Sequence, residues 1–237
     1  MMEVPAIIFP QPSVHVLGLR IDEPVTMLTD LLVSAVCFMA FARLRNAGSR
    51  GNAQMFFRFY FLLLGTATLL GGVMGHGFLY AFSLAWKLPG WIVSMVSVAC
   101  IERSAIEQAK PLIRRWVGKF FLVLNIIELL TIMTVTISTQ NFKWVEFHSG
   151  YGLLAIVMPF HLYVYYRTRD KASATVILAV LIACLAALAF MNKISIDTWF
   201  NYLDVSHVFM AIGVYVFMKG ALAMKNHNGS PAAIASI

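Results

Sequence analysis

The sequence has little charge. Asp, Glu, Lys and Arg make up only 12% of its 237 residues, whereas 60% of the residues are hydrophobic and the mean hydropathy is +0.78. A soluble domain carries charge on about a quarter of its residues. The shortage of charge therefore excludes an ordinary soluble domain and indicates an integral membrane protein.

Cysteine is also scarce. Cys37, Cys100 and Cys184 are the three cysteines, and each lies in an apolar stretch where a free thiol behaves as a small hydrophobe. Without a CxxC pair, neither a disulfide framework nor a thiolate zinc motif is predicted. We find no internal repeat and no short early apolar run followed by a cleavage site, so no removable signal peptide is expected.

Long apolar runs dominate the rest of the chain. A helix needs roughly 20 apolar residues to cross about 30 Å of hydrocarbon. The sequence therefore predicts an all-α bundle of seven transmembrane helices over residues 25–219, with an N-terminal tail at 1–24 and a C-terminal tail at 220–237. The predicted spans are residues 25–42, 55–79, 89–107, 117–138, 146–166, 174–192 and 200–218.

The basic residues predict the orientation. Of the 18 Lys and Arg, 14 fall on one side of the predicted bundle, and the other side holds Arg20, Lys87, Lys143 and Lys193. The positive-inside rule then places the N-terminus outside or in a lumen and the C-terminus in the cytoplasm. The net charge of +7 follows from this asymmetry, so we expect membrane lipids as partners and no nucleic acid. A bacterial inner membrane and a eukaryotic endomembrane both fit.

Polar residues gather in the outer third of the predicted bundle. His76, His148 and His207 each lie about one or two turns inside the outer face, on three different spans, and Asp30 and Asp204 lie about one turn inside it. A histidine in hydrocarbon is costly unless it is paired, hydrogen-bonded or bound to a metal. We therefore expect any chemistry to take place there.

Helical spacing favours two of these histidines. His76 continues a stripe of small residues, Gly65, Thr68 and Gly72, of the kind that lets membrane helices approach closely. Asp204 lies three residues before His207, so the carboxylate could orient the imidazole or join it as a ligand. For His148, the only evidence for a functional role is its depth in the membrane. A structural, hydrogen-bonded role stays open for all three histidines.

Two other polar residues lie deeper. His161 is thirteen residues after His148 and falls on a different helix face, so a structural role near the cytoplasmic interface is expected. Pro159 is expected to kink the helix between them. Glu128, in the middle of its span, is expected to be protonated or paired, with Asn125 as one candidate partner.

Three short stretches resemble a known superfamily. They run from Glu23 to Asp30, from Gly72 to His76 and from Ser206 to Tyr215. Together with the seven spans, they resemble the alkaline ceramidases and adiponectin/progestin-type receptors. The resemblance implies a zinc ion held by histidines and hydrolysis of a lipid amide.

The match to that superfamily is incomplete. Gly72 stands at its serine position, and the partner of His207 in its histidine pair would be Leu203 or Ala211. Its aspartate at the start of the third helix has no counterpart around residues 86–91. Either the chain has rebuilt the site or it is a non-catalytic relative.

The rebuilt site gives the most specific hypothesis. His76, His207 and His148 would bind zinc, with Asp204 or Asp30 as orienting group or general base. A zinc-activated water would then attack a lipid amide or ester carbonyl. Two alternatives stay open. One is a non-catalytic sensor, binding protein or partner subunit that uses the polar cluster, and the other is a membrane redox protein with a single haem on two histidines.

Overall fold

The protein folds as an all-α bundle. The structure, a computed structural model, describes residues 11–48 and 51–224, so parts of both expected tails lie outside the described residues. Within the described residues, six helices are long and apolar enough to cross a membrane, which makes the chain a multi-pass membrane protein. They are Pro24–Asn46, Asn52–Gly77, Leu84–Leu112, Arg115–Thr139, Lys171–Met191 and Tyr202–Ala223.

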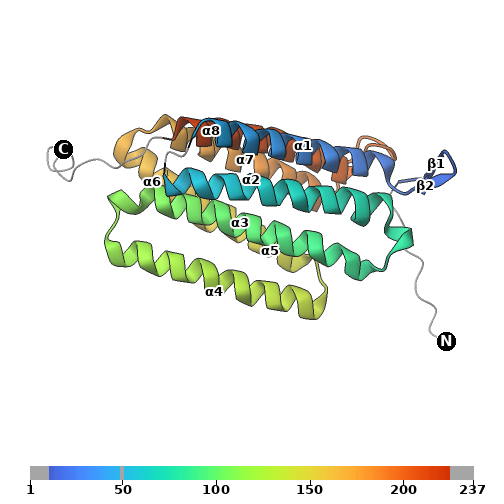
Figure 1. The fold of residues 1–237 in the computed structure, drawn as a ribbon, viewed down its shortest axis with the longest axis horizontal. Coiled ribbons are helices and arrows are strands. Elements are labelled where there is room, and N and C mark those ends of the chain that lie inside the picture. Colours follow the sequence, from blue (N-terminus) through green and yellow to red (C-terminus); the bar gives the residue numbers. More distant parts are fainter. Residues whose placement is uncertain (1–10, 49–50, 225–237) are drawn as a thin grey trace.

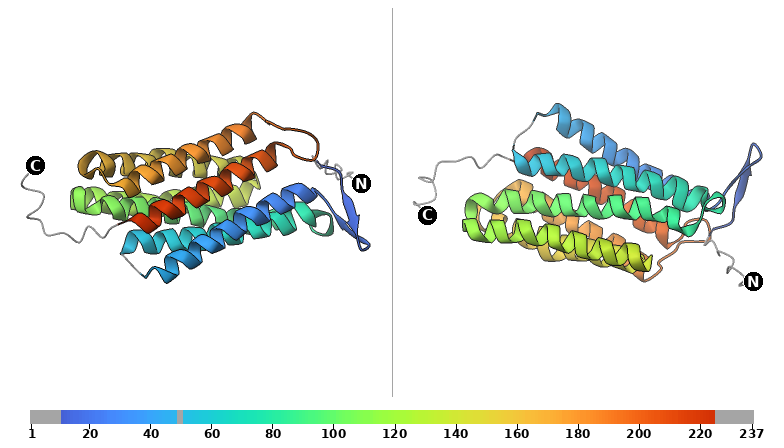
Figure 2. Two further views of the ribbon diagram at one scale, coloured as in Figure 1. Left: turned by 90° about the horizontal axis from the view of Figure 1, so that it is seen from above. Right: turned by 60° about the horizontal axis from the view of Figure 1, so that its bottom comes forward.

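Helix α1 (Pro24–Asn46) packs between α2 (Asn52–Leu70) and α8 (Tyr202–Ala223). On the far side of these two, α2 packs on α3 (Leu88–Ala109) and α8 packs on α7 (Lys171–Met191) (Figures 1 and 2). Because consecutive helices run in opposite directions, the start of α1, the end of α2 and the start of α8 lie at the same end of the bundle.

Helix α4 (Arg115–Thr139) lies at the edge of the bundle, where it packs on α3 and on α5 (Lys143–Tyr151). Gly118, Asn125 and Thr136 are its only buried residues. Most of its other side chains are apolar and face outward, as a lipid-facing helix requires.

The expected span at residues 146–166 is a composite helix. It consists of α5, the π-helix η5 (Gly152–Val157) and α6 (Met158–Thr168), and it is not among the six long apolar helices. Pro159 is the second residue after the π-helix. Proline has no N–H and its ring clashes with the carbonyl four residues earlier, and a wider π turn before it relieves that conflict.

Short elements close the ends. Strands β1 (Val14–Val16) and β2 (Leu19–Ile21) form an antiparallel hairpin before α1, within the expected outer tail. The π-helix η1 (Gly71–Gly77) continues α2. The 3-10 helices η2 (Leu79–Ala81) and η3 (Leu84–Lys87) lead into α3, and η4 (Lys110–Leu112) follows it.

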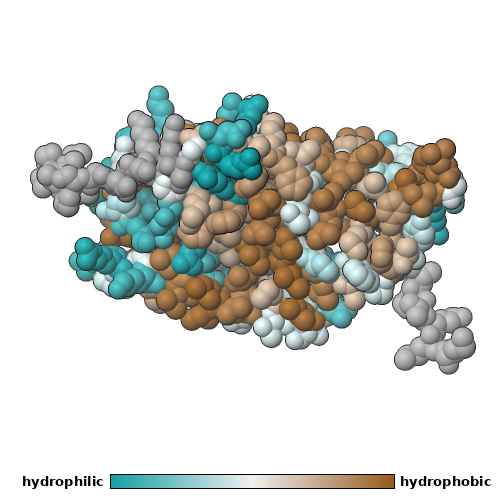
Figure 3. Space-filling view, in the orientation of Figure 1, coloured by the Kyte–Doolittle hydropathy of each residue, from teal (hydrophilic) through white to brown (hydrophobic). Residues whose placement is uncertain are grey.

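The apolar core is densest at the end opposite the hairpin. Phe57, Tyr60 and Phe61 near the start of α2 pack with Phe217 near the end of α8, and the Tyr60 and Phe217 rings are 5.7 Å apart. The outside is apolar as well. In Figure 3, hydrophobic side chains form a band across the middle of the visible face, hydrophilic side chains gather mainly toward its left end, and the right end is mixed. This banding suits a protein embedded in lipid.

Glycines allow α2 and η1 to lie close to α1. A methyl group at Gly65 would lie 3.0 Å from the Cβ atom of Cys37, and one at Gly72 would lie 2.9 Å from the Cβ atom of Asp30. Real Cβ atoms do not approach that closely, so larger residues would push the helices apart. The small-residue stripe thus packs against α1 and brings Asp30 next to η1.

Gly72→Ala should therefore destabilise the protein. Overpacking typically costs about 1–3 kcal/mol, which outweighs the helix propensity of about 1 kcal/mol that alanine gains over glycine. Gly150→Ala is the matched control, because nothing lies within 4 Å of a methyl group there. Thermal unfolding in detergent should show a lower midpoint for Gly72→Ala and an unchanged or higher one for Gly150→Ala. Equal midpoints would contradict the close-packing argument.

Candidate metal centre

Three elements build the polar site at the hairpin end of the bundle. The start of α1 supplies Glu23 and Asp30, the end of η1 supplies His76, and the start of α8 supplies His207. Asp30 lies between the two histidines. Its Oδ1 atom is 3.4 Å from Nε2 of His207, and its Oδ2 atom is 3.9 Å from Nε2 of His76.

His76 is held by Glu23. The Nδ1 atom of His76 lies 2.7 Å from Oε2 of Glu23. An ionised carboxylate only accepts hydrogen bonds, so Nδ1 donates and the Nε2 lone pair faces Asp30. Glu23 is itself buried, and its left-handed backbone conformation (φ 42°) is uncommon for a residue with a side chain. Such conformations concentrate at functional sites.

His207 is held by Thr29 in the same way. Its Nδ1 atom lies 3.0 Å from Oγ1 of Thr29. The single hydroxyl proton of Thr29 is directed to the carbonyl of Thr26 or to Oδ1 of Asp204, at 3.0 and 3.2 Å. The hydroxyl oxygen is therefore free to accept the Nδ1 proton of His207. This leaves the Nε2 lone pair of the second imidazole facing Asp30 as well.

Asp204 is a positioning residue. Its Oδ2 atom accepts from the backbone N–H of Asn201 and from Nε2 of Gln11, both at 2.7 Å, and its Oδ1 atom accepts from Thr29. The first of these bonds belongs to the capping box that begins α8. Asp204 is thus linked to His207 through Thr29, and both of its oxygens accept hydrogen bonds from other residues.

His148 requires a correction, because the structure does not bring it to His76 and His207. Its Nδ1 atom lies 2.8 Å from Oε1 of Glu128 on α4, and its Nε2 atom lies 2.9 Å from the carbonyl of Met95 on α3. Depth in the membrane does not reveal which way a side chain points, and depth was the only argument for including it. His148 belongs to a second polar cluster.

Two predictions about the deeper residues can now be compared with the contacts. Glu128 is paired, but with His148; Asn125 instead donates to Oε2 of Glu102 at 3.0 Å. His161 is buried and its Nδ1 atom lies 3.2 Å from the hydroxyl of Ser173 on α7, far from either histidine cluster.

Three residues at the site were not predicted from the sequence to take part in it. Gln11 lies in the N-terminal segment, yet its side chain joins Asp204 to the backbone N–H groups that begin α1. Lys87 in η3 packs its stem beside Gly75, and its charge interacts with the carboxylates of Glu23 and Asp30. Glu23 begins one of the stretches that resemble the superfamily, but no role was predicted for it.

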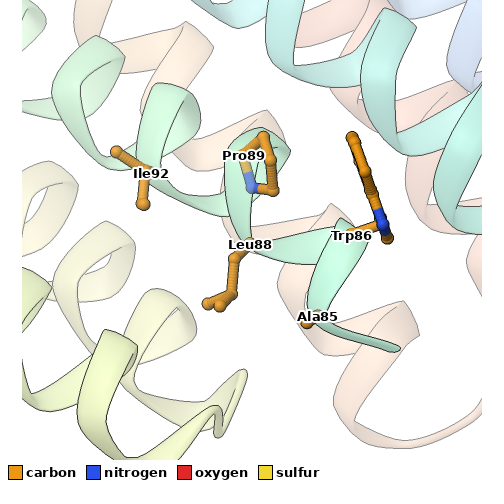
Figure 4. A pocket seen from close by; sticks show the side chains of 5 residues that line it. All are labelled: Ala85, Trp86, Leu88, Pro89 and Ile92. Carbon is orange, nitrogen blue, oxygen red and sulfur yellow. The ribbon is translucent and has the colours of Figure 1, made fainter. Parts of the chain in front are cut away.

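An apolar groove of about 330 Å³ lies where η3 leads into α3 (Figure 4). Lys87 lies in the chain between two of the groove residues, Trp86 and Leu88. The groove is lined by Ala85, Trp86, Leu88, Pro89 and Ile92. The charged end of this segment thus turns to the site while its apolar side chains form the groove.

The residues fit a metal ion by their chemistry. Asp30 has a carboxylate oxygen within 4 Å of the Nε2 atom of each histidine, and a catalytic zinc site commonly has two histidines and one carboxylate as protein ligands. The separations of 3.4 and 3.9 Å exceed hydrogen-bond lengths. They involve different Asp30 oxygens, and within the described residues this trio is not a set whose ligand atoms all lie within 4.8 Å of one another, so the side chains would have to move closer to hold an ion.

The comparisons with known proteins identify one family. A model described as a family of unknown function (DUF6962) matches residues 25–226. The chain belongs to this family. No curated protein and no solved structure matches it. The matched residues include Asp30, His76 and His207 but not Glu23, so the family region contains the three converging ligands. The resemblance to alkaline ceramidases and adiponectin/progestin-type receptors stays a hypothesis.

Thr29→Val should destabilise the protein, because valine keeps the shape of threonine but removes the hydroxyl. The Nδ1–H group of His207 then loses its acceptor, and an unsatisfied buried polar group costs about 1–3 kcal/mol. Thr29→Ser retains the hydroxyl and serves as the matched control. Unfolding in detergent should show a clear loss for valine and a small one for serine, whereas similar losses would contradict the proposed hydrogen-bond chain.

Proposed function

We propose that the protein is a zinc-dependent membrane hydrolase that cleaves an amide or ester bond of a lipid. One observation carries this proposal: Glu23 and Thr29 hold the Nδ1 atoms of two histidines, so both Nε2 atoms face Asp30. Carboxylate or hydroxyl partners on the second ring nitrogen are the usual support of metal-binding histidines. Two histidines held only for structural reasons would not need to present their free lone pairs to one carboxylate.

Each residue has a separate task in this proposal. A zinc ion held by His76, His207 and one oxygen of Asp30 would supply a water of lowered pKa and polarise the carbonyl. The other oxygen of Asp30 would accept the proton of the attacking water. Lys87 would stabilise the negative charge that develops on the carbonyl oxygen. Glu23 and Thr29 keep the imidazoles oriented, and Asp204 acts through Thr29.

A lipid substrate is supported by the surroundings of the site. The site lies in a bundle of membrane-crossing helices, and the groove beside Lys87 has an apolar lining. The geometry favours this hydrolase over a single-haem protein, because Asp30 lies between the two imidazole rings where a haem iron would have to be.

Metal content and activity test the hydrolase directly. Purified protein should contain zinc that His76→Ala and His207→Ala each remove from this site, because two ligands cannot hold the ion as three do. Both variants should lose lipid hydrolysis, measured as release of fatty acid from labelled amides and esters in mixed micelles. His15→Ala, on the exposed face of the hairpin, is the control and should keep both zinc and activity. Zinc without any product would instead indicate a sensor or binding protein.

We also propose that the composite helix α5–η5–α6 completes seven crossings and that the N-terminus lies outside. The distribution of Lys and Arg supports this orientation. In a variant with the three native cysteines replaced, Leu17→Cys in the hairpin should react with a membrane-impermeant maleimide on intact cells. Lys110→Cys at the end of α3 should react only after the membrane is opened. The opposite pattern would reverse the topology.

A further inference from the structure

We infer that Glu102, Glu128 and His148 form a second, buried site for a divalent metal ion, separate from the site at the hairpin end. They come from α3, α4 and α5. Each offers one ligand atom, and these atoms all lie within 4.8 Å of one another. Among the residues that the structure describes, this is the one set of three or more His, Cys, Asp or Glu residues gathered so closely.

His148 is oriented as a metal ligand. Its Nε2 atom lies 2.9 Å from the carbonyl oxygen of Met95. A carbonyl only accepts, so Nε2 carries a proton, and Nδ1 and the Glu128 carboxylate share a second proton that a metal ion would replace. Nδ1 lies 2.8 Å from Oε1 of Glu128. Donation from the second ring nitrogen to a backbone carbonyl is a common way to orient a metal-binding histidine.

Glu102 provides an independent observation. The residue is only 1% exposed, and Asn125 donates to its Oε2 atom, but its Oε1 atom is buried without a hydrogen-bond partner in the protein. Oε2 of Glu128 is also buried and unpartnered. Gly152, at the start of η5, leaves the space for Oε1 of Glu102, since a methyl group there would lie 2.5 Å from it. A bound cation would satisfy both oxygens.

The charges match a divalent ion. Two ionised carboxylates and a neutral imidazole have a net charge of −2, and burying them uncompensated among apolar helices would be very costly. A divalent ion neutralises both carboxylates together. One nitrogen and two carboxylate oxygens suit zinc, iron or manganese, and zinc is the probe for the test.

The site would fasten α4 to the bundle. This helix has few buried side chains, and Asn125 and Glu128 provide its polar contacts to α3 and α5. A metal ion bound to all three helices would replace the apolar packing that α4 lacks. The role is structural, and it does not depend on whether the first site hydrolyses a lipid.

Zinc binding to the full-length protein in detergent tests the second site. Chelator-stripped protein would be loaded with zinc, desalted and measured by elemental analysis. We expect about two zinc ions per chain in the wild type and about one in the His76→Ala/His207→Ala double variant. Adding Glu102→Gln should remove that remaining ion, whereas Glu107→Gln, the control on a carboxylate of the same helix that pairs with Lys110, should not. A double variant that binds no zinc, or that keeps it with Glu102→Gln, overturns the inference.

Thermal unfolding gives a second measurement, and an alternative variant is available if one of the proteins fails to fold. Zinc should raise the midpoint of the double variant, because a ligand that binds only the folded state stabilises it. The rise should disappear with Glu102→Gln or, if that protein fails to fold, with His148→Gln; no rise in the double variant itself would count against the site. If zinc content falls with Glu102→Gln but not with His76→Ala, the first metal site is contradicted and the second is not.

Discussion

The close contact of α1 with the end of α2 is the constraint on which the outer site depends. At Gly72 the two helices approach so closely that no Cβ atom fits between them, and Asp30 therefore lies beside η1. The same contact sets His76 next to Glu23, the residue that precedes α1. Helix α8 packs on the other side of α1, so His207 reaches Asp30 from there. Both histidines are thus positioned by the packing of their helices against α1.

Both polar clusters adjoin a π-helix that begins with glycine. His76 lies in η1, and Gly152 at the start of η5 makes room for Glu102. A π turn is wider than an α turn and interrupts the regular hydrogen bonding of the helix, and it is found most often at functional sites. The wider turn shifts the residues that follow around the helix axis. In this fold each helix continues across the bundle after its π turn. The turn at η1 directs His76 into the outer cluster, and the turn at η5 places Gly152 beside Glu102.

Hydropathy predicted most of the fold, because the length of an apolar run is set by the membrane and not by the details of packing. It missed the break of the composite helix at η5, since π turns have no strong sequence signal. Helical spacing placed Asp204 and His207 on one face, and in the structure Thr29 connects the two side chains. It could not show that the capping box and Gln11 occupy the Asp204 carboxylate, because Gln11 comes from a segment nearly two hundred residues away in sequence. His148 was misplaced since depth fixes one coordinate of a side chain and leaves its direction open.

A count of charges explains why both clusters need a cation or a proton. The outer cluster contains Glu23, Asp30 and Asp204 against His76 and His207, and the inner cluster contains Glu102 and Glu128 against His148. In each, carboxylates outnumber histidines by one. Even with every histidine protonated, one negative charge would remain in each cluster. The charge of Lys87 interacts with the carboxylates of the outer one, but no basic side chain forms an ion pair with Glu102 or Glu128 within the described residues other than His148. The inner cluster therefore has the stronger electrostatic demand for a bound ion, although the outer one has the geometry for chemistry.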